Sequence, residues 1–556
     1  MSVSSANDTS PDDGPFAPLR VGAFRNIWLS SIAANLGQLM LGVGAAWEMT
    51  RLTDDTGMVA LVQTALMLPL MLVAVPAGAV ADMFDRRITA MAGILFAALS
   101  ATVFALLTAA GIAGPWMILS FCFLIGAGVA FYAPSWQASI SEQVPATLLP
   151  AAIALGTISY NIARSLGPAI GGFLVAAVGA QAVFALNAMF FLPMAGAFYL
   201  WKRKPQPSRL PPERLGRAII SGARYSWNAG NIRTVLFRLV VFGLTSASAV
   251  ALAPVIAKDK LGGDAAVFGL LLAAIGAGAV TGALSVSRVQ ARMSTETIVG
   301  LNALATGAAL AVAGLSSWLP LTLAALFVSG VTNIITTALL MVTVQLSAPR
   351  WVTGRALSFS TSALTGGIAG GAWLWGEVAE VWGITTALLV SGAASASSTF
   401  LRYVTFIESA RVVEVESAPI GYEPEVALDL TTRSGPVAVE ISYRVDPDEA
   451  RAFYAAMGDV QKMRQRNGAF GWSLSRDIAD PWLWIERYQC ATWGDYLRLR
   501  DRWTTADRSI QEKADAFHHA SDEPRVRRRL ERPIGSVRWR SDTPDARHDD
   551  FNMIGQ

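Results

Sequence analysis

Charged residues are scarce in this sequence. Asp, Glu, Lys and Arg make up 15% of its 556 residues, whereas hydrophobic residues make up 53%. An ordinary soluble protein carries about 25% charged residues, so most of this chain has too little charge to face water on all sides. The deficit is confined to about residues 26–404, and the sequence from about 406 onward has the composition of a soluble protein.

Cysteine and histidine are also rare. Cys122 and Cys490 stand in different halves of the chain, and all three histidines fall in the last forty residues. This usage argues against a disulfide framework, a metal site and a zinc enzyme. The net charge of +3 is too small to favour nucleic acid, and no basic-aromatic stripe supports that partner. We therefore expect no cofactor, no metal and no nucleic-acid partner.

The apolar part of the chain divides into twelve runs, each long enough to cross a membrane. A spanning helix needs about 20 mostly apolar residues. The runs are 27–49, 58–81, 88–111, 116–137, 149–177, 181–201, 234–256, 265–287, 296–314, 319–344, 356–379 and 384–405. A soluble helical core is a poor alternative, because twelve nearly uncharged helices would have no polar face for water.

Basic residues collect in alternate breaks between these runs. One set of breaks holds most of the Lys and Arg, including Arg86–Arg87 and the linker that begins WKRKPQPSRLPPERLGR. Cytoplasmic loops collect these residues, so we expect both termini in the cytoplasm. Residues 1–20 are polar and lack the features of a secretory signal, which predicts a disordered cytoplasmic tail.

The two sets of six runs show signs of an internal repeat. A single ungapped offset of 204 residues superposes five Gly or Pro positions. The pairs are Gly78/Gly282, Gly126/Gly330, Pro145/Pro349, Gly167/Gly371 and Gly172/Gly376. Two parallel six-helix repeats are the arrangement of one large transporter class, with the substrate site between the halves.

The loop after the second run reads GAVADMFDRR. It resembles the loop signature of the major facilitator superfamily, and the positions that fit are Gly78, Asp82, Arg86 and Arg87. Met83 stands where that signature has an arginine, and Asp85 stands where it has a glycine. The resemblance implies a conformational switch in which Asp82 faces a helix N-terminus. We expect Arg86 and Arg87 at the lipid head groups, and the alternative is that the basic pair only obeys the positive-inside rule.

The fifth run contains YNIARSLGPAIGG, residues 160–172. Its helix-packing motif, Gly167, Pro168, Gly171 and Gly172, resembles the fifth-helix signature of the superfamily's antiporters. That resemblance implies the contact between the two halves that closes one side of the cavity. Ordinary packing of small residues is the alternative.

Arg164 is a charge in the middle of this apolar run. Such a charge costs at least about 2.5–3.5 kcal/mol on insertion scales, so it should face protein or a wet cavity. Asn161 shares its helical face, and Asn35 and Gln38 on the first span could accept hydrogen bonds from it. Arg164 therefore either lines the substrate cavity or ties the first and fifth spans together.

Two further polar residues complete the predicted cavity and coupling set. Glu48 is a carboxylate near the outer end of the first span, where it suits proton exchange. The alternative is that its side chain only reaches the membrane–water interface. Asn187 lies within the sixth span and either lines the cavity or bonds a neighbouring helix. Proton coupling rests mainly on the family resemblance.

Residues 133–172 also resemble a narrower group, the subfamily of the enterobactin exporter and related efflux proteins. The Pro-Ser-Trp-Gln start, the Val-Pro loop and the Asn-x-x-Arg before Gly-Pro carry this resemblance. It implies a secondary transporter, not an enzyme, that exports a siderophore or another amphipathic small molecule, driven by protons. Import remains open because a fold does not fix direction.

The segment after the last span predicts a separate soluble domain. Strand and helix patterns follow the order β-α-β-β-α-β, with a last strand near 533–539, which suggests a ferredoxin-like fold. Its distinctive residues are Arg466, Trp472, Glu486, Arg498, Arg502 and His518. It resembles the soluble extension of some transporters of this subfamily. Related domains include dimerising monooxygenases, so the alternatives are a catalytic domain, a regulatory domain and a domain for self-association.

The predicted fold is an all-α polytopic membrane protein with twelve transmembrane helices in two six-helix pseudo-repeats, plus a C-terminal α+β ferredoxin-like domain. The predicted segments are a tail 1–20, bundles 21–205 and 233–405, linkers 206–232 and 406–434, a soluble domain 435–540 and a disordered tail 541–556. The expected partners are a small-molecule substrate, protons and the lipid bilayer.

Overall fold

A computed structural model of the chain describes residues 16–203, 215–349, 352–407, 426–519 and 525–531. It divides into two compact units. The larger contains Met1–Leu215, Thr234–Val342 and Ser358–Glu408, and the smaller contains Gly216–Arg233, Thr343–Leu357 and Ser409–Gln556. Of the two tails predicted to be disordered, residues 1–15 and 541–556 lie outside the described residues, and Ala17–Arg20 at the end of the first predicted tail form a helical turn instead.

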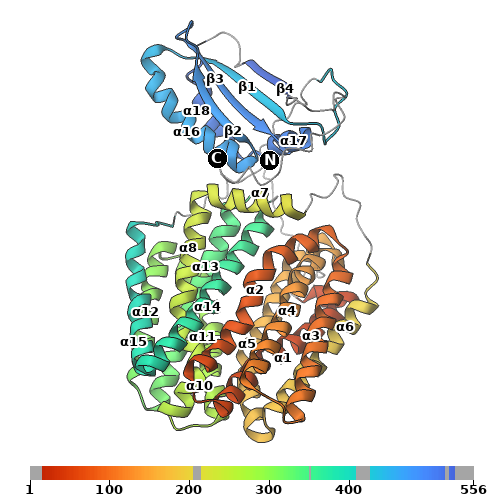
Figure 1. Cartoon of the computed structure of the whole chain (residues 1–556), viewed down its shortest axis with the longest axis vertical. Coiled ribbons are helices and arrows are strands. Elements are labelled where there is room, and N and C mark those ends of the chain that lie inside the picture. The colour runs from red at the N-terminus through yellow and green to blue at the C-terminus, as the bar shows by residue number, and fades with distance from the viewer. Residues whose placement is uncertain (1–15, 204–214, 350–351, 408–425, 520–524, 532–556) are drawn as a thin grey trace, which may run out of the picture. The chain divides into compact units, whose positions relative to one another are not determined.

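Six long helices form the first half of the larger unit (Figure 1). They are α1 Gly22–Leu52, α2 Thr56–Met83, α3 Arg86–Ala109, α4 Pro115–Gln143, α5 Leu149–Val178 and α6 Ala180–Leu200, with the short turns η1 Ala17–Arg20 and η2 Ala146–Leu148. Asp55 and Asp85 begin α2 and α3, because each carboxylate accepts from amide groups of the first helical turn.

The second half has the same plan. Its first span consists of four consecutive elements: α8 Gly230–Ser246, α9 Ser248–Ala251, α10 Ala253–Val255 and the π-helical η3 Ile256–Lys260. The elements that follow are α11 Ala265–Gln290, α12 Thr295–Leu315, α13 Leu319–Ser347, α14 Thr353–Trp382, α15 Ile384–Ser397 and η4 Ser398–Tyr403. The strongly amphipathic α7, Leu215–Asn228, lies in the segment predicted as the linker between the halves.

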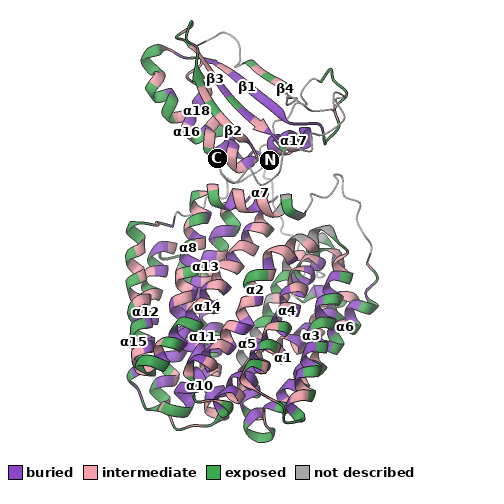
Figure 2. Cartoon of the chain, viewed as in Figure 1, coloured by how far each residue is buried: buried purple, intermediate pink, exposed green. Residues whose placement is uncertain are grey.

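Eleven helices among the described residues are long and apolar enough to cross a membrane. The remaining predicted span, 356–379, corresponds to the 30-residue helix α14, which is rich in Ser, Thr and Gly and carries Glu377 and Glu380. The chain is therefore a mostly helical polytopic membrane protein. In Figure 2, exposed residues follow the outward sides of the bundles, and many of them are large and apolar, such as Leu99, Leu106 and Leu192.

The halves repeat at the spacing that the glycine matches predicted. The first and last residues of α13 and α14 lie 204 residues after those of α4 and α5. Within the first half, α2 and α3 each pack on α4, and α1 packs on α5 and α6. The halves meet where α5 packs along α11.

The smaller unit contains a four-stranded antiparallel sheet with the spatial order β2-β3-β1-β4. The strands are β1 Val437–Arg444, β2 Phe470–Arg476, β3 Leu483–Cys490 and β4 Arg525–Leu530; the helices are α16 Ala450–Asn467, α17 Trp493–Asp501 and α18 Thr505–Asp515, with the turn η6 Pro447–Glu449. The single second helix of the prediction is thus two helices, because Thr504 starts a new one with a capping box to Asp507. The last strand lies at β4, and residues 533–539 are outside the described part.

Candidate functional site

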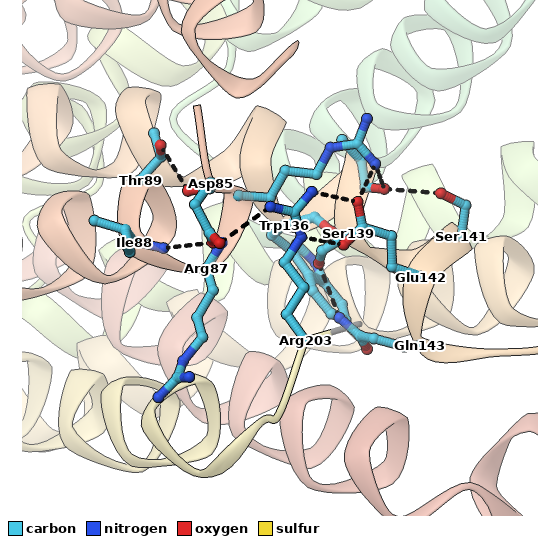
Figure 3. Close-up of polar contacts among 12 residues, drawn as sticks. Asp85, Arg87, Ile88, Thr89, Trp136, Ser139, Ser141, Glu142, Gln143 and Arg203 are labelled. Carbon is cyan, nitrogen blue, oxygen red and sulfur yellow. Dashed lines mark hydrogen bonds and ion pairs between the residues drawn. The ribbon is translucent and has the colours of Figure 1, made fainter. Parts of the chain in front are cut away.

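A cluster of charged side chains joins the ends of α3, α4 and α6 (Figure 3). Arg203, just after α6, binds Glu142 of α4 through Nε–Oε2 at 2.6 Å and Nη2–Oε1 at 2.9 Å. It also pairs with Asp85 at 3.1 Å, and Arg86 pairs with Glu142 at 3.0 Å. We call these four residues the inner charge cluster and call this the inner end of the spans.

Arg86 and Arg87, which the sequence analysis placed at the lipid head groups, both bind protein groups. Arg86 donates to the carbonyl of Ala138 at 2.8 Å. Arg87 donates to the carbonyls of Phe198 and Tyr199 in the last turn of α6. A cation at a helix C-terminus satisfies carbonyls that have no partner within the helix. These contacts join α3 to α4 and α6.

Asp85 is the second acid of this cluster and pairs with Arg203, whereas Glu142 binds both arginines. Partial burial would raise the pKa of Asp85, but the hydrogen bond from Arg203, the amides of Ile88 and Arg87 and the charge of Arg203 together lower it. The hydrogen bonds that Arg203 donates to Glu142 and Asp85, and the charges of these two carboxylates, outweigh burial and raise the pKa of Arg203. Sequence reasoning had assigned the acidic role to Asp82, whose side chain lies outside the described part of the structure, as does that of Asn161.

The lowered pKa of Asp85 predicts a pH-dependent contribution to stability. Because its folded pKa lies below the unfolded value of about 3.9, the contribution is present above that value and is lost as pH falls through the folded pKa. The Asp85 side chain is 39% exposed, so Asp85→Asn should cost less than about 1 kcal/mol at pH 7. Thermal unfolding of the purified chain should show this deficit at pH 7 and a smaller one at about pH 2, below the unfolded pKa. An equal deficit at both pH values would contradict the assignment.

The glycine motif lies on two faces of α5. A Cβ built on Gly167 or Gly171 would lie 3.1 Å from Leu39 or Met40 of α1. A Cβ on Gly172 would lie 2.6 Å from the Cα of Gly269 in α11. Gly172 therefore allows α5 and α11 of opposite halves to touch at backbone distance. Gly78 allows a similar close contact between α2 and α14, because a Cβ built on it would lie 3.1 Å from the Ser358 hydroxyl of α14.

Arg164 reaches the opposite half of the bundle. Its Nη2 donates to the Oδ1 of Asn333 in α13 at 3.4 Å, a long hydrogen bond. The predicted contacts with Asn35 and Gln38 are wrong. Asn35 donates instead to Ser159 at 3.3 Å, and the Gln38 Oε1 is buried without a hydrogen-bond partner among the described residues.

The geometry of α5 explains this correction. Pro168, one turn after Arg164, has its carbonyl close to Gly269 of the opposite half. The face of α5 that carries Arg164 thus meets the second half, and Gly167 and Gly171 meet α1. Arg164 and Asn333 each lie halfway along their helices.

Glu48 and Asn187 occupy different surroundings. Glu48 pairs with Arg51 at 3.1 Å, and its side chain is 13% exposed. Asn187 is fully buried against Gly37 of α1, and neither of its amide atoms has a hydrogen-bond partner among the described residues. A buried amide group without a hydrogen-bond partner costs about 1–3 kcal/mol of folding free energy.

Sequence reasoning missed a buried ion pair in the second half. Arg238 of α8 pairs with Glu296 of α12 at 2.8 Å, and both side chains are about 95% buried. Arg238 also donates to the Thr405 carbonyl at 2.8 Å, and Glu296 accepts from the Ile407 amide at 3.0 Å. The available signal was an arginine inside the apolar run VLFRLVVF. The pair fastens the end of the last span to two other helices.

The smaller unit has a polar cluster inside its core. Glu486 of β3 is fully buried and accepts from Arg464 at 2.9 Å, Trp472 at 3.0 Å and Tyr443 at 3.3 Å. The predicted residues Trp472 and Glu486 thus meet, but their cation is Arg464. The other distinctive residues lie outside this cluster. Arg466 binds Asp507, and Arg498 pairs with Asp495 at 3.1 Å. The His518 Nδ1 accepts from the Arg444 amide at 2.9 Å, and Arg502 directly follows α17.

The helical unit has the fold of a major facilitator transporter. A POT family transporter in complex with 5-aminolevulinic acid superposes with a TM-score of 0.57 at 12% identity, over 71% of this chain and 97% of that one. A D-xylose–proton symporter gives a TM-score of 0.54 at 12% identity, over 68% and 97%. At these identities the likeness concerns the fold alone.

Residues 13–534 match the family of the transmembrane secretion effector, and the chain belongs to this family of the major facilitator superfamily. It is 27% identical to the multidrug efflux pump Tap of Mycobacterium tuberculosis, over 49% of this chain and 68% of that protein. It is also 24% identical to the staphyloferrin A transporter of Staphylococcus aureus, over 47% and 66%. The chain is therefore a secondary transporter.

Proposed function

We propose that this transporter exports an amphipathic small molecule, of siderophore or drug-like type, by alternating access coupled to protons. Two distant relatives support this class of cargo, since one is named a multidrug efflux pump and the other a transporter of the siderophore staphyloferrin A. The proposed location is a bacterial inner membrane with both termini in the cytoplasm, which the basic inner ends of the spans support.

One observation carries the proposal for the substrate site. Arg164 and Asn333 meet between the halves, each at the middle of its helix. Transporters of this architecture bind substrate between the repeats near the bilayer midplane. A guanidinium in that place favours cargo with carboxylate, phenolate or carbonyl oxygens. Because its hydrogen bond to Asn333 is long, Arg164 can exchange this partner for a substrate oxygen at low cost.

The inner charge cluster is the proposed conformational switch of the first half. It links α3, α4 and α6 through ion pairs and carbonyl caps, so these helices should move as one body. Gly78 then sets how closely α2 approaches α14 of the second half.

For the smaller unit we propose a ferredoxin-like domain that regulates the transporter or mediates self-association. Its strand order and antiparallel pairing support that fold. The buried Glu486 is already bound by three side chains, an arrangement that favours a structural core over a catalytic carboxylate. The rival proposal is a monooxygenase-like enzyme.

The test compares the accumulation of candidate compounds in cells that carry or lack the chain. Cells with the parent chain should retain less of an amphipathic anionic compound. Arg164→Ala should reduce efflux at least about tenfold, because a hydrogen bond to a charged group contributes about 1.5–3 kcal/mol. Arg288→Ala, at an exposed position on α11, is the matched control and should leave efflux unchanged. Normal efflux by Arg164→Ala at normal expression would remove this residue from the site.

A further inference from the structure

The turn between α1 and α2 is held by two charged side chains from the opposite half, at the outer end of the spans. The Lys258 Nζ donates to the Thr50 carbonyl at 2.9 Å and lies 3.2 Å from the Asp54 carboxylate. On the other side of the turn, the Glu380 Oε2 accepts from the Thr56 amide at 2.7 Å.

The signs of these charges match the helix ends that they bind. Thr50 lies in the last turn of α1, where carbonyls have no partner within the helix, and Thr56 is the first residue of α2, where amides have none. A cation stabilises the C-terminal end of a helix, and an anion stabilises the N-terminal end. The second half therefore provides a partner for each helix end of the first half. Lys258 binds the carbonyl end of α1, and Glu380 binds the amide end of α2.

Small residues bring the backbones together next to these contacts. A Cβ built on Gly376 of α14 would lie 2.6 Å from the Ala60 Cβ of α2, and one built on Gly57 would lie 3.4 Å from the Glu377 carboxylate. Lys258 belongs to the π-helical turn η3, a local widening that often occurs at functional positions. The two charges are thus attached to helices that already touch the first half.

We infer that Lys258 and Glu380 form an outer gate, in which each side chain caps a helix of the opposite half and stabilises the state with closed outer ends. The inference rests on the proposed alternating access. When the outer ends separate, both caps are lost, and water then replaces them on the two exposed helix ends. The gate therefore biases the equilibrium between the two states without contacting the cargo.

The strength of the gate should be modest. A charge at an exposed helix end shifts an equilibrium about two- to five-fold. Glu380→Gln and Lys258→Gln should each shift the equilibrium toward open outer ends by that factor. The double variant should combine the two factors, because the caps bind different helices. Asp259→Asn is the matched control, since it removes an exposed charge from the same turn.

Distances between spin labels measure this equilibrium in the purified full chain without a substrate. One label pair, Ile112→Cys with Leu315→Cys, reports the outer ends of the two halves, and a second pair, Ile88→Cys with Met293→Cys, reports the inner ends; all four side chains are exposed. Both native cysteines are buried and are replaced for the experiment. The gate variants should show a longer outer distance and a shorter inner distance than the parent. The control Asp259→Asn should give the same distances as the parent.

Unchanged distance distributions in both gate variants would overturn the gate. An equal change in Asp259→Asn would also overturn it, because the effect would then be one of net charge. Failure of the export proposal would look different. In that case the gate variants would still shift the distances, while no candidate compound would show efflux.

Discussion

Gly172→Val should reduce transport at least about tenfold while the amount of chain in the membrane stays near that of the parent. A Cβ at this position would lie 2.6 Å from the Gly269 Cα and 2.7 Å from the Ala265 carbonyl oxygen. Both partners are backbone atoms, so no side chain can rotate away. The halves would have to separate along α5 and α11, and the state with closed outer ends would become inaccessible.

Efflux of a transported compound measures this effect, with the protein amount determined by blotting. Gly196→Val is the control, because a Cβ on Gly196 of α6 has no neighbour within 4 Å. The spin-label pair at the outer ends should also report longer distances in Gly172→Val than in the parent. Parent-like transport by this variant would show that the close contact of α5 and α11 is not required.

Arg464→Met should destabilise the smaller unit by about 3–5 kcal/mol. This substitution leaves the fully buried Glu486 carboxyl without its cation, and removing one partner of a buried pair costs that amount. Burial alone would lower the pKa of Arg464, but the Glu486 carboxylate beside it outweighs burial and raises that pKa, so the guanidinium stays charged in the folded protein. The ring of Tyr488, 5.0 Å from the guanidinium carbon, also loses its cation.

Hydrogen exchange of the β1 and β3 amides in the full chain measures this loss. The double variant Arg464→Met with Glu486→Leu should recover part of the stability, because it leaves no unpaired buried charge. Lys462→Gln in α16 is the control. It breaks an exposed pair with Asp459, so its effect should stay within about 0.5 kcal/mol. Parent-like exchange in Arg464→Met would contradict a structural role for the pair.

Hydropathy and spacing were sufficient for most of the membrane fold. A helix that crosses lipid must make its backbone hydrogen bonds within one apolar run, so its position can be predicted from the local sequence. The offset of 204 residues and the contact of Gly172 with the opposite half were predictable for a similar reason, because small residues mark close helix contacts. The order of strands and helices along the smaller unit also followed from local patterns, except that Thr504 divides the second helix and that the last strand lies at Arg525–Leu530, before the predicted 533–539.

Partners of charged residues could not be predicted in the same way. Arg164 binds Asn333, which lies 169 positions away and in the other half, and nothing local indicates that pairing. Arg203 and Glu142 meet because three helix ends converge, and Asp85 then serves as their second acid. In the smaller unit, Arg464 and Arg466 are two positions apart on one helix and point to different sides, so only the packing of α16 decides which of them meets Glu486.

The central claim is that this chain moves a small molecule through a site between its two halves, with Arg164 in that site. The most direct test is transport by purified chain in proteoliposomes under an imposed pH gradient, with parent and Arg164→Ala compared at equal protein. We predict accumulation that depends on the gradient with the parent and at least about tenfold less with the variant. Equal transport by both proteins, or none by the parent with every amphipathic compound tried, would contradict the account.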